Sequence, residues 1–101
     1  MANDPELGYA TYTAEQVSGT VVIHAQGDAP ASGYRVWLEK SMIDIFPPEF
    51  ALYWEPPGGL AADMMMPFIV HVSFPAEDPV ASVTVRDIDG MHEVPVEQVP
   101  G

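Results

Sequence analysis

Residues 68–74 read Phe-Ile-Val-His-Val-Ser-Phe, and residues 83–87 read Val-Thr-Val-Arg-Asp ahead of the segment 91–96, Met-His-Glu-Val-Pro-Val. Successive side chains of a strand point to opposite faces, so the first stretch predicts a strand with its phenylalanines and valines buried and with His71 and Ser73 facing outward. The pair Asp89-Gly90 supplies the positive φ angles that a tight hairpin turn requires. The last third of the chain therefore predicts a β-meander.

The same period of two recurs earlier in the chain. Turn-forming glycines and prolines predict loops over 27–33 and 55–67. We expect the strands at 9–14, 20–25, 34–40, 41–46, 50–54, 68–74, 80–87 and 91–97. No helical period is present, so we expect an all-β fold, an immunoglobulin-like or fibronectin-type two-sheet β-sandwich of about seven strands. A transthyretin-like or small jelly-roll arrangement would produce nearly the same pattern.

The length and composition of the chain indicate one folded domain. The 101 residues are 48% hydrophobic, which is too apolar for a disordered chain. We expect a single domain over residues 1–101, with flexible ends at 1–7 and 98–101.

The charge balance excludes one class of partner. Fifteen acidic residues against three basic ones give a formal net charge of −12. Phosphate binding needs clustered lysines and arginines, so we expect neither nucleic acid nor a membrane surface as a partner. Cationic partners, or solubility alone, remain as explanations of the acidity.

Two features of the sequence bear on the compartment. The sequence has no cysteine, and its first residues lack the basic and apolar regions of a signal peptide. No window approaches the roughly 20 apolar residues of a membrane span. We expect a cytoplasmic protein, although an exported protein with its signal removed would have the same pattern.

The residues that catalysis would need are missing or wrongly spaced. The serines show no nucleophile-elbow pattern, there is no cysteine nucleophile, and Gly58-Gly59 is followed by no lysine that could complete a phosphate loop. We therefore expect no enzyme and no cofactor.

The loop at 55–67 is the first candidate binding site. Long connections without secondary structure are often functional, and this one carries Leu60 and the run Met64, Met65 and Met66, whose side chains adapt to irregular partner surfaces. The alternative is that the three methionines fill one end of the core.

Trp37 is the second candidate. If Val36 and Leu38 face the core, Trp37 lies on the opposite face beside Arg35, and interface centres are enriched in tryptophan and arginine. An inverted register, or a loop that covers the ring, would remove this surface.

Two metal sites are the alternative from another functional class. Asp87 and Asp89 with Gly90 resemble a fragment of a calcium loop, and His92 follows closely. The methionine run together with His24, His71 and His92 suggests copper, because thioether and imidazole groups suit that metal. The sequence does not show how the strands that carry His24 and His71 pair.

These observations favour a non-enzymatic, acidic interaction or accessory domain that binds another protein or forms a homo-oligomer. A small metal-binding or carrier protein is the alternative.

Overall fold

The computed structural model describes residues 4–59 and 64–100, and these residues form strands, turns and loops without a helix. The strands are β1 (Glu6–Leu7), β2 (Thr11–Val17), β3 (Thr20–Ala29), β4 (Arg35–Lys40), β5 (Glu49–Glu55), β6 (Met66–Pro75), β7 (Ser82–Asp87) and β8 (Gly90–Gln98). The expected all-β class is confirmed. Among the described residues, no helix has the length and apolar character needed to cross a membrane.

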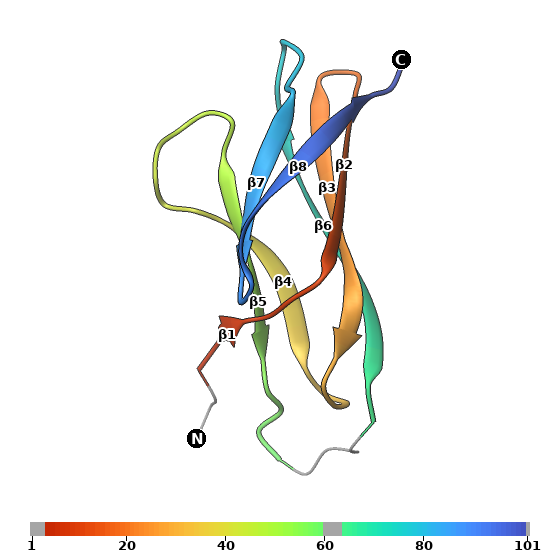
Figure 1. The fold of residues 1–101 in the computed structure, drawn as a ribbon, viewed down its shortest axis with the longest axis vertical. Helices are drawn as coiled ribbons and strands as arrows, with labels where there is room; N and C mark the ends of the chain where they lie inside the picture. Colours follow the sequence, from red (N-terminus) through yellow and green to blue (C-terminus); the bar gives the residue numbers. More distant parts are fainter. Residues whose placement is uncertain (1–3, 60–63, 101) are drawn as a thin grey trace.

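The strands form one continuous hydrogen-bonded path in the order β1-β5-β7-β8-β2-β3-β6, with β4 pairing with β5 off this path. β8 connects the two halves of this path, because it pairs antiparallel with β7 and, towards its end, parallel with β2. The sheet curls like half a barrel, with the β2-β3-β6 side opposite the β4-β5-β7 side (Figure 1). The curl is not closed by hydrogen bonds, since β4 and β6 border a groove lined by residues 36–38 and 69–71.

The core fills the inside of this curl. Ile23 on β3, Leu52 on β5 and Val85 on β7 are fully buried and belong to one hydrophobic cluster. On β6, Phe74 is buried while Phe68, Val70 and Val72 pack partly buried against the same cluster. The predicted inner face of 68–74 is therefore confirmed, as is the outward direction of its polar residues.

Two hairpin turns show how local sequence ends the strands. Ser18 and Gly19 both have positive φ, 50° and 82°, as a two-residue turn between the twisted strands β2 and β3 requires. Between β7 and β8, Gly90 has a φ of 117°, whereas Asp89 has none of the positive values that the sequence suggested. Only the glycine of that pair therefore adopts the unusual conformation.

Several element boundaries differ from the sequence expectation. Residues 27–29, predicted as a loop, extend β3 because they pair with residues 66–68 of β6. Residues 41–46, predicted as an edge strand, form a loop that projects from the body between β4 and β5 (Figure 1). At the two ends, Glu6–Leu7 pair with Tyr53 and Trp54 and Gln98 lies in β8, so these residues of the ranges expected to be flexible belong to strands.

Candidate functional site

Three side chains stack on the outer face of β4 and β5. Trp37 lies opposite Tyr53 in the ladder, and their rings are stacked with centroids 6.1 Å apart. The Arg35 guanidinium lies over the Trp37 ring, 5.2 Å from its centroid. The NH1 atom of Arg35 is also 3.6 Å from the Oε1 of Glu55. The neighbours Val36 and Leu38 pack against the core, so this group projects from the sheet in the register that the sequence predicted.

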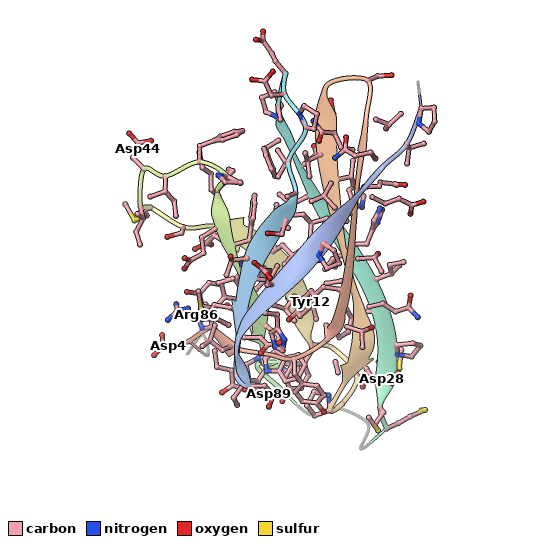
Figure 2. All side chains as sticks on the ribbon, turned by 45° about the horizontal axis from the view of Figure 1, so that its top comes forward. Asp4, Tyr12, Asp28, Asp44, Arg86 and Asp89 are labelled. Carbon is pink, nitrogen blue, oxygen red and sulfur yellow. The ribbon has the colours of Figure 1, made fainter. Side chains whose placement is uncertain are left out.

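The other two basic residues of the sequence lie near this group: Arg86 is exposed on β7, and Lys40 ends β4 in the same alternation as Val36 and Leu38. Arg86 donates to the Tyr53 hydroxyl at 3.4 Å. Arg35, Lys40 and Arg86 are the three basic residues of the whole sequence. Arg86 lies on the outside of the ribbon, away from β6 (Figure 2). We call Arg35, Trp37, Lys40, Tyr53 and Arg86 the cationic-aromatic face.

A hollow of about 240 Å³ opens between the cations of this face, and small Ala51 lies in its lining. Its wall includes both basic and acidic side chains: Glu39, Lys40, Ser41, Met42, Glu49, Phe50, Ala51, Tyr53 and Arg86. Glu39 accepts a hydrogen bond from the Trp37 indole nitrogen at 3.2 Å. Within residues 4–59 and 64–100, neither Lys40 nor Arg86 forms an ion pair. Two cations of this very acidic chain are thus left available to a carboxylate from outside.

The methionine run lies elsewhere on the sheet. Met66 begins β6 opposite Ala29, whereas Trp37 belongs to the β4–β5 ladder. Met64, Met65 and Met66 are 58%, 58% and 41% exposed, so they do not fill the core as the alternative interpretation required. Leu60 lies outside the described residues. The structure therefore brings Arg35 and Trp37 together but does not place the methionines in their group.

The predicted metal residues form a different kind of cluster. The Asp87 carboxylate is buried, and its Oδ1 accepts from His92 Nε2 and from the Asp89 backbone nitrogen, both at 2.8 Å. Its Oδ2 accepts from the Tyr12 hydroxyl at 2.5 Å. Tyr12 lies in the middle of the molecule, behind β8 (Figure 2). Burial raises the pKa of Tyr12 above its usual range, and the hydrogen bond to Asp87 and the charges of Asp87 and Asp89 raise it further.

This arrangement uses Asp87 as an internal acceptor. A calcium ligand needs a carboxylate oxygen that can turn towards the ion, whereas both oxygens of Asp87 already accept hydrogen bonds from protein donors. Asp89 contributes its backbone nitrogen here rather than its carboxylate. Across the described part of the chain, no three histidine, aspartate or glutamate side chains are grouped so that they could hold a metal ion.

One exposed apolar segment was not predicted from the sequence. Met42, Ile43, Ile45 and Phe46 are all exposed in the projecting loop, with Asp44 at its tip (Figure 2). The Phe46 ring contacts Phe74 edge to face, with centroids 6.0 Å apart. The alternation in 41–46 indicated a strand, but Pro47-Pro48 was the signal for a loop, because proline cannot donate to a ladder. Met42 lines the hollow, so this loop borders the cationic-aromatic face.

Comparison with known proteins adds no relative. No protein-family description, curated protein or solved structure matches the chain.

Proposed function

We propose that this chain is a non-enzymatic interaction domain that binds another protein through the cationic-aromatic face. The observation that supports it is the stack of Arg35, Trp37 and Tyr53 on the side of the sheet that faces away from the core. Tryptophan, tyrosine and arginine carry much of the binding energy in protein interfaces, because the aromatic rings bury large areas and arginine forms charge-assisted hydrogen bonds. The inward contacts of β4 to the core are made by Val36 and Leu38, so the stack is not part of the core packing.

The charges favour a partner that presents carboxylates. Lys40 and Arg86 border the hollow without an ion pair, and the chain has no other unpaired lysine or arginine in its described part. A carboxylate that entered this hollow would gain charge-assisted hydrogen bonds to these two side chains. Glu39 and Glu49 on its rim would disfavour carboxylates placed elsewhere, which would add specificity.

We further propose that the curled sheet is a variant of the immunoglobulin-like two-sheet sandwich. Supporting this, the path divides at β8 into a β2-β3-β6 side and a β4-β5-β7 side. Residues from both sides contribute to one hydrophobic cluster, as the two inner faces of a sandwich do.

A site-specific photo-crosslinker tests the binding proposal. We would introduce it in place of Trp37, express the protein in its native host, and identify the adducts by mass spectrometry. The matched control carries the crosslinker at Thr13, which is exposed on the outer face of β2. We expect a discrete protein adduct from position 37 that is absent from position 13 and is weakened by Arg86→Gln.

Other outcomes of this experiment have different meanings. An adduct between two copies of this chain would identify the partner as a homo-oligomer, which sedimentation velocity on wild type and Trp37→Ala would then measure. The same adducts from both positions, or none from position 37, would contradict binding at this face.

A further inference from the structure

The ladder between β3 and β6 places two histidines directly opposite each other. His24 pairs with His71 in the register, and their ring centroids are 6.2 Å apart. Both belong to the outward-facing set of their strands, because the neighbours Ile23 and Ala25 are fully buried and Val70 and Val72 pack against the core. Two imidazoles therefore stand side by side on a solvent-facing surface, far in sequence but adjacent in space.

A carboxylate already orients one of the two rings. Glu15 on β2 lies with its Oε1 3.3 Å from His24 Nε2. When His24 donates its Nε2 proton to this carboxylate, its Nδ1 keeps a lone pair, and histidine ligands of metals are commonly held by such a carboxylate on the other nitrogen. In the described ranges, no side-chain hydrogen bond holds His71; its ring pairs with the His24 ring, and it lines the groove shared with residues 36–38.

We propose that His24 and His71 form a two-imidazole surface site for a divalent transition-metal ion, with Cu²⁺ bound most tightly. Imidazole nitrogens suit copper, and the general affinity order of first-row divalent ions places Cu²⁺ highest. Water completes the coordination, because the protein contributes two ligands here and no group of three is preorganised in its described part. The net charge of −12 raises the local concentration of any cation near this face.

This site uses none of the residues of the cationic-aromatic face, although Trp37 and His71 both line the groove between β4 and β6. His24 and His71 lie in the β3–β6 ladder, whereas the Trp37 and Tyr53 stack lies in the β4–β5 ladder. It also differs from the copper site that the sequence suggested, since it uses no methionine. The sequence alone did not show the β3–β6 register that places His24 opposite His71.

Copper titration of the full chain tests the proposal, followed by calorimetry and electron paramagnetic resonance. We expect one saturable Cu²⁺ site per chain and a spectrum with nitrogen ligands. His71→Asn and His24→Asn should each weaken binding at least about tenfold, and Zn²⁺ should bind more weakly than Cu²⁺. Glu15→Gln should weaken it by about 10-fold or more without removing the nitrogen signature, because Glu15 positions His24 and is not itself a ligand.

The control is Thr13→Asn, an exposed change on β2 directly opposite His24. It should leave copper binding and the melting temperature unchanged. Thermal melts of each histidine variant without metal would separate loss of binding from loss of fold. The proposal is overturned if wild type shows no saturable site, or if the double variant His24→Asn with His71→Asn binds copper as wild type does.

Discussion

At the scale of single residues, polar side chains form hydrogen bonds between strands that are distant in the sequence. The buried Asp87 carboxylate takes donors from Tyr12, His92 and the backbone of Asp89. A buried charge is tolerated only when such donors replace water. The contact to Asp89 is local and follows from a hairpin turn, whereas Tyr12 is 75 positions away in the sequence, so no local pattern could have predicted it.

Gln16 has a comparable role at the other end of the sheet. Its Oε1 accepts from the Val80 backbone at 2.8 Å and from Gln98 at 3.0 Å, and its Nε2 donates to the Asp78 carbonyl at 3.0 Å. This one side chain holds the segment before β7 and the end of β8 against β2. Its place in the sequence, between Glu15 and Val17, gave no sign of this role.

Removing the Tyr12 hydroxyl should be costly. Tyr12→Phe leaves a buried carboxylate short of one donor, so we expect the free energy of unfolding to fall by about 1.5–3 kcal/mol, as for hydrogen bonds to charged groups. Tyr53→Phe is the matched control, since its hydroxyl makes one 3.4 Å contact to Arg86 on an exposed face. Urea denaturation of both variants measures the difference, and equal losses would show that the Asp87 contact contributes nothing special.

The raised pKa of Tyr12 predicts a loss of stability in alkali. Below about pH 10, the ordinary tyrosine pKa, Tyr12 is protonated in both the folded and the unfolded chain. Above that pH the unfolded chain releases this proton while the folded chain keeps it, because burial and Asp87 raise the folded pKa. The unfolded state then binds fewer protons, so stability falls as pH rises. Melting temperatures between pH 8 and 11 should decline more steeply in wild type than in Tyr12→Phe; parallel declines would assign the effect to other groups.

At the scale of elements, the period of two located the strands and their buried faces well. The inner face of β6 and the outward position of Trp37 followed from alternation alone. The errors came where pairing overrides local composition: Gly27 looks like a turn residue, but in β3 it makes room for the Phe68 ring, which would lie 3.1 Å from an added Cβ. In 41–46 the alternation was present without a partner strand, and the segment is a loop.

Two isoleucines on neighbouring strands test the assigned register. Ile23 on β3 is fully buried, whereas Ile69 on β6 is 68% exposed. Ile23→Ala should lower the free energy of unfolding by about 2–5 kcal/mol through lost burial and a cavity. Ile69→Ala should change it by no more than about 0.5 kcal/mol, as for most surface substitutions. Urea unfolding compares them, and a larger cost at Ile69 would mean that the register is shifted by one residue, which exchanges the two faces.

At the scale of the whole molecule, the features that matter for function depend on which strands meet. β8 runs parallel to β2, with Ala14 opposite Val96, and strand periodicity says nothing about such distant pairing. The same holds for the candidate sites: Arg35 and Trp37 are close in sequence and were predictable as a pair, but their union with Tyr53 and Arg86 required the topology. The pairing of His24 with His71 likewise depends on the β3–β6 register.

The charge of the whole chain leads to a prediction about salt. Fifteen acids against three bases give a net charge of −12, and self-repulsion of this kind opposes the compact state. Raising the ionic strength from about 10 mM to about 0.15 M shortens the screening length from roughly 30 Å to roughly 8 Å. The molecule measures 47 × 26 × 20 Å, so repulsion spans most of it at low salt and is confined to near neighbours at the higher concentration. We therefore expect the melting temperature near neutral pH to rise with sodium chloride, mostly below about 0.15 M.

A variant with fewer acids separates this effect from general salt effects on hydration. Glu77→Gln with Glu97→Gln removes two negative charges at exposed positions, so its net charge is less negative than that of wild type. It should melt at a higher temperature than wild type in low salt and should gain less from added salt, because there is less repulsion to screen. Calorimetric scans at matched pH across the salt series make the comparison. A wild-type melting temperature that stays flat or falls with salt would mean that attractive pairs, such as Arg35 with Glu55, outweigh the repulsion among the acids.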